Sequence, residues 1–436
     1  MSTLMSGMKL AGASKEVCTA AMQKLFGFPV SLKATSGRSG ATSYLVMKAE
    51  GAIAGCLKIP GGVMHNKEVT SLRMQKATQA LRDAKIAPSC LFTGDDFFVE
   101  ESGGLSVMKD FFHFKEDVEP SLIAELLARF HTTVETSWYS ELVDKFYANE
   151  DVKMKPLLEK AKAEEKLCSP FWNLPFSGID VGKIIMGMGN IPDSITTAVL
   201  QKELETGVYE KVMLSETFSP ATEAGRRQVL VHGDFKPDNM LKKEGANQLT
   251  AIDFDLTQVG PAINDFGFML MMWFGPRFTD FEYREKFVKT YLSKSGGKAD
   301  QDSVHAFMLD AEINTIVAFP GLLANIYDQE VPMLRGVEHA TAKTKKEPEY
   351  RACKTSDENL PTGLELVDLL EESVKAVRSD SALSRASIEN GLVPTLYETK
   401  GLEGKLDAGK SKFLYAWLMH MRDSNMLRLF GISPSV

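Results

Sequence analysis

The fold is decided by residues 228–256, which read QVLVHGDFKPDNMLKKEGANQLTAIDFDL. An apolar run at 228–231 precedes a polar loop, and two shorter apolar runs follow on either side of a glycine-bearing turn. This order predicts a strand, a loop and then a hairpin of two strands. The polar side chains therefore lie in a loop that is fixed by strands on both sides.

The loop and the strand after it carry three oxygen-bearing side chains. Asp234 and Asn239 lie five residues apart, and Asp253 follows fourteen residues later. One carboxylate can orient an acceptor hydroxyl and take its proton, while an amide oxygen and a second carboxylate suit Mg²⁺, which prefers hard oxygen ligands. The pattern predicts a phosphoryl-transfer site. For any one of these residues taken alone, a polar turn capped by Asp and Asn is the alternative.

The motif HGDFKPDNM followed by IDFD resembles the catalytic loop and metal motif of the choline kinase and aminoglycoside phosphotransferase family, small-molecule kinases with a protein-kinase-like fold. The resemblance implies that Asp234 is the catalytic base and contacts the acceptor. It also implies that Asn239 and Asp253 bind Mg²⁺, that ATP is the phosphoryl donor, and that His232 supports the loop. Glycine rather than arginine after His232 favours the small-molecule branch over protein kinases.

The N-terminal region has the pattern of a small sheet. Residues 30–60 alternate as three antiparallel strands, 66–85 has helical spacing, and short strand-like runs continue to residue 112. Helical patterns prevail afterwards. These patterns predict an α+β chain with a boundary near residue 112. The resemblance implies that it is a bilobal, protein-kinase-like fold, with a nucleotide-binding N-lobe of antiparallel strands (1–112), a larger, mainly helical catalytic and acceptor-binding C-lobe (113–436), and Mg²⁺-ATP in the cleft.

The resemblance also implies a set of nucleotide contacts. The turn at 36–40 would approach the triphosphate, Lys58 on the third strand would contact the α- and β-phosphates, Glu68 would hold the Lys58 ammonium, and backbone groups at 108–110 would pair with adenine. A simple hairpin, an outward-facing lysine and a surface acid are the alternatives for the first three. The implied residues are Gly37, Arg38, Ser39, Gly40, Lys58, Glu68, Met108 and Asp110.

The segment NDFGFMLMMWF, which begins at Asn264, resembles a choline kinase segment with aspartate, glycine and tryptophan at Asp265, Gly267 and Trp273. By this resemblance Asp265 braces the catalytic loop by accepting backbone hydrogen bonds. The alternative is an N-cap for the apolar helix that Asp265 opens. Trp273 would contact the acceptor.

The acceptor region departs from choline kinases at several positions. Met272 replaces a glutamate that helps to hold the cationic head, and the two pocket tryptophans fall on Ala324 and Tyr327. Tyr327 is kept as a predicted acceptor contact, but most of an aromatic box for a quaternary ammonium is missing. The sequence therefore predicts that choline is a poor acceptor.

Composition excludes several other classes of protein. The 436 residues are 44% apolar and 25% charged, as in ordinary globular chains, and the net charge of −8 disfavours nucleic acid as a partner. Five scattered cysteines without a CxxC pair predict reduced thiols and a cytoplasmic location, with an organellar address as the alternative. The most apolar run, 266–275, is too short for a membrane span.

The predicted function is transfer of the γ-phosphoryl group of ATP to a hydroxyl of a small metabolite, such as a choline- or ethanolamine-like alcohol, an amino alcohol or a sugar. A protein kinase is disfavoured because no APE-like segment follows Asp253. A catalytically silent nucleotide-binding protein of the same fold is the alternative from another class. The acceptor, the oligomeric state and the role of the last hundred residues stay open at this level.

Overall fold

The structure is a computed structural model, and it describes residues 9–35, 42–59, 74–110, 113–114, 118–138, 211, 215–233, 235–243, 245, 247–254, 257–266, 280–317 and 363–398. Contacts divide the chain into two compact units. The first contains Met1–Val107 and Asp238–Asp255, and the second contains Met108–Pro237 and Leu256–Val436.

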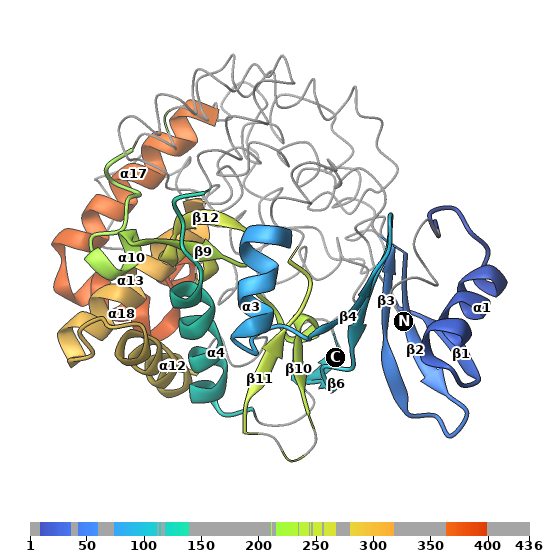
Figure 1. The fold of residues 1–436 in the computed structure, drawn as a ribbon. Coiled ribbons are helices and arrows are strands. Elements are labelled where there is room, and N and C mark those ends of the chain that lie inside the picture. The colour runs from blue at the N-terminus through green and yellow to red at the C-terminus, as the bar shows by residue number, and fades with distance from the viewer. Residues whose placement is uncertain are drawn as a thin grey trace, which may run out of the picture. The chain divides into compact units, whose positions relative to one another are not determined.

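The first unit is built on an antiparallel sheet of five strands in the order β1-β2-β3-β5-β4 (Figure 1). The predicted meander is present, because β1 pairs with β2 and β2 with β3 in neighbouring antiparallel registers. The strands are β1 (Val30–Ala34), β2 (Thr42–Lys48), β3 (Ile53–Ile59), β4 (Cys90–Thr93) and β5 (Phe98–Glu101).

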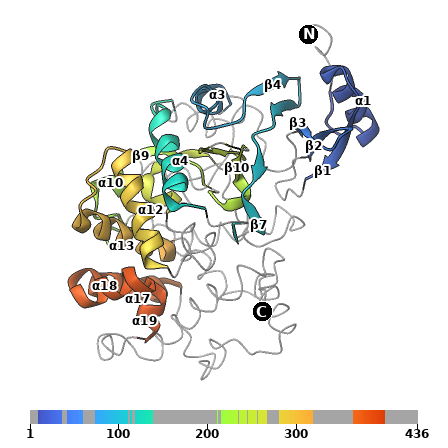
Figure 2. The ribbon, with the colours of Figure 1, turned by 90° about the horizontal axis from the view of Figure 1, so that it is seen from below.

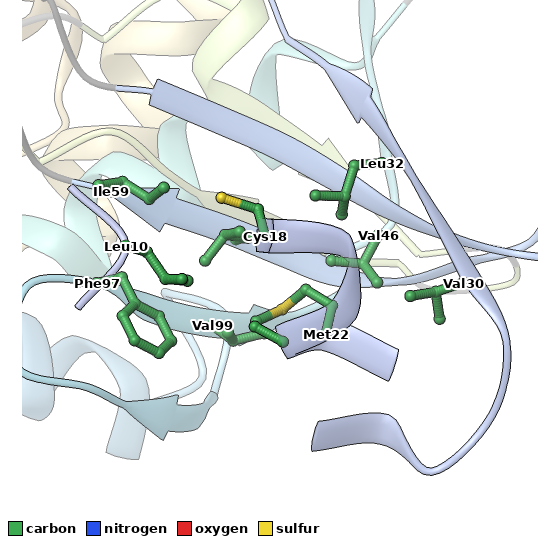
Figure 3. Packing of buried hydrophobic residues seen from close by; sticks show 11 residues of the cluster. Leu10, Cys18, Met22, Val30, Leu32, Val46, Ile59, Phe97 and Val99 are labelled. Atoms are coloured by element: carbon green, nitrogen blue, oxygen red, sulfur yellow. The ribbon is translucent and has the colours of Figure 1, made fainter. Parts of the chain in front are cut away.

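One face of this sheet is covered by helix α1 (Lys15–Phe26), which the sequence analysis did not predict. Its local signals are clear, since the Ser14 side chain caps the first turn and Gly27 ends the helix with φ of 74°. Figure 3 shows the apolar side chains between helix and sheet. They are Leu10, Cys18, Ala21, Met22, Val30, Leu32, Val46, Leu57, Ile59, Phe97 and Val99.

A second, three-stranded sheet joins distant parts of the first unit. Its order is β11-β10-β6, with β6 (Leu105–Ser106), β10 (Met240–Lys242) and β11 (Leu249–Ala251), and all its pairs are antiparallel. These pairs explain why 238–255 groups with the N-terminal residues. The sequence predicted one continuous boundary near residue 112, whereas the contacts divide the chain after Val107 and return this later segment to the first unit.

The helix expected over 66–85 is described only in its C-terminal part. A π-helical turn, η2 (Met74–Thr78), leads into α3 (Gln79–Asp83), and Lys85 ends it with φ of 58°. Residues 61–73 lie outside the described ranges. Arg82 of α3 is buried and forms a 2.7 Å ion pair with Glu100 of β5, which ties the helix to the five-stranded sheet.

The second unit is mainly helical. Helix α12 (Phe281–Lys294) packs against two other helices, α4 (Pro120–Thr133) and α13 (Gln301–Val317) (Figure 2). Phe266, Phe287, Tyr291 and Phe307 form an aromatic cluster between them. The α+β class predicted from the sequence is thus confirmed, with antiparallel strands in the N-terminal part and helices in the C-terminal part.

The remaining elements of this unit are short strands, short helices and a C-terminal helical group. Strand β9 pairs antiparallel with β12, and β7 with β8. In chain order these elements are β7 (Met108–Asp110), β8 (His113–Phe114), α10 (Glu223–Arg226), β9 (Gln228–Val231), β12 (Gln258–Pro261), η4 (Ala262–Asp265), α17 (Gly363–Ser379), α18 (Ser381–Asn390) and α19 (Leu392–Glu398). A 3₁₀ turn, η3 (Pro237–Asn239), precedes β10.

A buried ion pair links the C-terminal helices to the rest of the second unit. The Arg284 guanidinium of α12 contacts the Glu312 carboxylate of α13 at 2.5 Å, and both side chains are almost fully buried. Arg284 also donates to the backbone carbonyl of Ile388 at 2.6 Å, and the Leu392 amide donates to Glu312 at 2.9 Å. Glu312 thus connects α12, α13 and the start of α19 through buried contacts.

Among the described residues, none of the helices combines the length and the hydropathy needed to cross a lipid bilayer.

Candidate active site

Lys58 and Asp253 meet within the first unit. Side chains alternate along β3, so that Leu57 and Ile59 are buried in the core under α1 while Lys58 projects from the other face. Its Nζ lies 3.0 Å from Oδ1 of Asp253, with side-chain exposures of 16% and 39%. Two residues that lie 195 positions apart in the sequence are therefore joined by a partly exposed ion pair.

Asp253 has an unusual backbone conformation. Its φ is 66°, in the left-handed region that non-glycine residues other than Asn and Asp seldom adopt. The residue follows β11 directly, and the Ile252 amide just before it donates to the Asn239 carbonyl at 3.0 Å. This hydrogen bond joins the backbone directly before Asp253 to the Asn239 segment.

Asn239, the second predicted Mg²⁺ ligand, ends the 3₁₀ turn η3 and is only 4% exposed. The Ile252–Asn239 hydrogen bond places the two predicted ligands on adjacent backbone segments. Their donor set, one carboxylate and one amide oxygen next to a lysine that neutralises charge, is chemically suited to Mg²⁺ bound to phosphates. The residues present fit the ion that the resemblance implies.

The start of the catalytic-loop motif is held by Asp265 within the second unit. The His232 amide donates to Asp265 Oδ2 at 2.6 Å, and the Gly233 amide donates to Oδ1 at 2.9 Å. Gly233 has φ of 77°, which glycine adopts without steric cost. The His232 ring lies in an aromatic environment between Phe130 and Phe235.

A buried histidine that the sequence analysis missed also contacts Asp265. His131, near the end of α4, approaches Asp265 Oδ2 through Nε2 at 2.9 Å, and its Nδ1 lies 2.8 Å from the Tyr291 hydroxyl. The side chains of His131 and Asp265 have no exposed surface. A buried face of an amphipathic helix was the only signal in the sequence, because both partners are more than 130 residues away.

Burial lowers the pKa of His131 below its ordinary value of 6.5, and the Asp265 carboxylate opposes this shift. Arg227 and His232 favour the neutral ring further. In the unfolded chain the same ring takes up a proton as the pH falls through about 6.5. The unfolded state then binds more protons than the folded state, so stability is present above that pH and is lost below it.

We therefore expect a pH-dependent difference between the wild type and His131→Gln. Below about pH 6.5 the wild-type free energy of unfolding should fall more steeply, by up to about 1.4 kcal/mol per pH unit, because glutamine takes up no proton. Urea unfolding followed by circular dichroism at about pH 7.5 and pH 5.5 measures this difference. Parallel losses in the two proteins would contradict the neutral assignment.

Cys56 lies on the same face of β3 as Lys58, two residues before it. Burial raises the pKa of its thiol to about 11, and Glu100 adds to the shift. The thiol is therefore protonated near neutral pH and is a poor nucleophile.

The other predicted site residues fall into two groups. The backbone of 108–110 forms strand β7, whose partner is β8. The remaining residues lie outside the described ranges: Gly37, Arg38, Ser39, Gly40, Glu68, Asp234, Gly267, Met272, Trp273, Ala324 and Tyr327.

The class of protein follows from comparison with known families. Residues 200–307 match the phosphotransferase enzyme family. This segment contains His232, Asn239, Asp253 and Asp265. The match confirms the class of protein predicted from the loop motif, a phosphotransferase.

Several solved structures of small-molecule kinases are similar to the chain. An ethanolamine kinase from Plasmodium vivax matches with 14% identity, a TM-score of 0.41, and coverage of 74% of this chain and 84% of that one. A choline kinase from Cryptosporidium parvum has 14% identity, a TM-score of 0.45 and coverage of 76% and 96%. A macrolide 2'-phosphotransferase from Brachybacterium faecium has 14% identity, a TM-score of 0.38 and coverage of 76% and 99%. A search of curated proteins finds no match.

Proposed function

We propose that the protein is an ATP-dependent kinase that phosphorylates a hydroxyl group of a small metabolite. The observation that carries this proposal is the pairing of Lys58 with Asp253, which stands on a strand end hydrogen-bonded to the Asn239 segment. A cation and hard oxygen ligands are thus available for a nucleotide triphosphate and its metal. The phosphotransferase match of residues 200–307 supports the same reaction class.

In the proposed reaction Asp234 orients the acceptor hydroxyl and takes its proton. A bond forms between the acceptor oxygen and the γ-phosphorus, and the bond from that phosphorus to the bridging oxygen breaks, so that ADP leaves. Asn239 and Asp253 would hold Mg²⁺, which neutralises charge on the phosphate oxygens. Lys58 would contact the α- and β-phosphates, with the turn at 37–40 and the backbone at 108–110 as further nucleotide contacts.

The acceptor side of the proposal rests on Trp273 and Tyr327 as contacts. A cytoplasmic location belongs to the same proposal, and it is supported by the free thiols of Cys18, Cys56 and Cys90 among the described residues.

Choline is expected to be a poor acceptor compared with another alcohol, amino alcohol or sugar. Met272 replaces the glutamate that would hold the cationic head, and Ala324 removes one aromatic wall of an ammonium box. Steady-state kinetics with choline, ethanolamine and neutral alcohols test this expectation. Saturable phosphorylation of choline at micromolar concentrations would contradict it.

The proposed function is tested by a metabolite screen with ATP labelled on the γ-phosphorus. Purified protein is incubated with a protein-free cell extract, and labelled products are separated and identified. We expect label to appear in a small molecule, dependent on both Mg²⁺ and the protein. Label found only in added protein substrates would indicate a protein kinase, and nucleotide binding without any labelled product would indicate a silent binding protein.

A further inference from the structure

The Asp265 carboxylate accepts hydrogen bonds from three donors inside the second unit. Oδ1 accepts from the Gly233 amide, and Oδ2 accepts from both the His232 amide and the His131 ring. The two amides belong to the residues directly before Asp234. The third donor, His131, comes from α4, a separate helix, and it is the only side chain among the three.

The donor and acceptor roles of the hydrogen bonds that run from Asp265 through His131 to Tyr291 can be assigned. Carboxylate oxygens only accept, so His131 Nε2 carries the hydrogen and its Nδ1 in the neutral ring accepts from the Tyr291 hydroxyl. Arg227 in turn donates to the Tyr291 oxygen at 3.5 Å and to the Ser295 carbonyl at 2.6 Å. Burial raises the pKa of Tyr291 to about 12, so the hydroxyl keeps its hydrogen.

We propose that His131 is a positioning residue for phosphoryl transfer, which fixes the Asp265 carboxylate and through it the backbone of His232 and Gly233, the two residues before Asp234 in the sequence. The inference rests on the proposed function, since Asp234 is the base only if the protein is a kinase. Without the Nε2–H, one buried oxygen of Asp265 loses a donor, and the carboxylate is free to rotate away from one of the two loop amides. A small displacement of a catalytic group costs rate rather than substrate binding.

Three variants separate this role from packing alone. His131→Leu removes both ring nitrogens, whereas His131→Gln keeps an N–H donor that reaches Asp265. Val288→Ala is the matched control, because Val288 is fully buried on α12, the helix that carries Tyr291, but makes none of these hydrogen bonds. Each is compared with the wild type in kinetics and in amide hydrogen exchange of residues 229–235.

We expect His131→Leu to lower kcat by about 100-fold with little change in KM for ATP or acceptor. Exchange of the loop amides should accelerate by about tenfold or more. His131→Gln should recover most of both losses, while Val288→Ala should leave both near wild type. If His131→Leu does not fold, Tyr291→Phe takes its place, because it keeps the ring packing and removes only the hydroxyl that orients His131.

The inference is overturned if the histidine or tyrosine variants match Val288→Ala in kcat and in loop exchange. It is also overturned if His131→Gln is as impaired as His131→Leu, since the donor would then be irrelevant. A wild type that phosphorylates no acceptor would refute the proposed function, and with it the catalytic part of this inference. Hydrogen exchange would still decide whether His131 holds the loop.

Discussion

Replacing Asp253 with asparagine is expected to reduce phosphoryl transfer from ATP by at least about a thousandfold, equivalent to about 4 kcal/mol of transition-state stabilisation. The carboxylate would be a ligand of the Mg²⁺ that neutralises charge on the transferred group. It also neutralises Lys58 at 3.0 Å. The asparagine amide has the same shape as the carboxylate but carries no negative charge. It would therefore bind Mg²⁺ more weakly and would no longer neutralise the Lys58 ammonium.

Asparagine is a cleaner substitution here than alanine. The φ of 66° at Asp253 is accessible to asparagine, whereas alanine would add backbone strain of about 1 kcal/mol to the loss of the ligand. Glu50→Gln provides the matched control, because it removes an exposed carboxylate from a turn of the same unit. Unchanged turnover at saturating Mg²⁺ in folded Asp253→Asn protein would exclude Asp253 as a metal ligand.

Asp234→Ala is expected to lower kcat by about 100- to 10,000-fold while nucleotide binding stays close to that of the wild type. The proposed base accepts a proton from the acceptor and holds neither the metal nor the phosphates. Its neighbours are anchored independently, because the His232 and Gly233 amides bond to Asp265 and Phe235 is buried. The variant should therefore fold and bind ATP normally.

Binding and turnover measured on the same preparation distinguish the two aspartates. Asp253→Asn should weaken Mg²⁺-dependent nucleotide binding as well as rate, whereas Asp234→Ala should affect the rate alone. Titration calorimetry with a non-hydrolysable ATP analogue and turnover with labelled ATP provide both quantities. Equal turnover in Asp234→Ala and wild type would remove the assignment of the base and favour the silent binding protein.

Local periodicity was sufficient to predict the meander, because one face of β1 to β3 must be buried and the other is not. The same reasoning missed α1. Only Cys18, Ala21 and Met22 of that helix are buried, and they are too few and too varied in size to form an apolar stripe. Its capping residues, Ser14 and Gly27, were the usable signal.

The positions of strands were also easier to predict than which strands would pair with each other. The sequence indicated short strands around 240 and 250, but not that β10 would pair with β6 across more than 130 residues. Such pairing depends on which edges remain open after the rest of the unit has formed. The return of 238–255 to the first unit is therefore a property of the tertiary structure.

The candidate site shows the same limit. Asp234, Asn239 and Asp253 stand out because their spacing within one short segment is informative, and their roles stay predictions until the variants are measured. His131 has no such context, since its partners lie 134 and 160 residues away. From the sequence alone, a buried histidine on an amphipathic helix cannot be distinguished from other residues of the core.

The buried Arg284–Glu312 pair bears on how the protein must be made. Arg284 donates two hydrogen bonds to carbonyls at the end of α18, so a polypeptide shortened before α18 would bury a positive charge that lacks these two acceptors. Synthesis must therefore proceed through the last described helices before this helical unit reaches its final stability. Proteolytic cleavage before α18 should therefore destabilise the folded helical unit and not only shorten the chain.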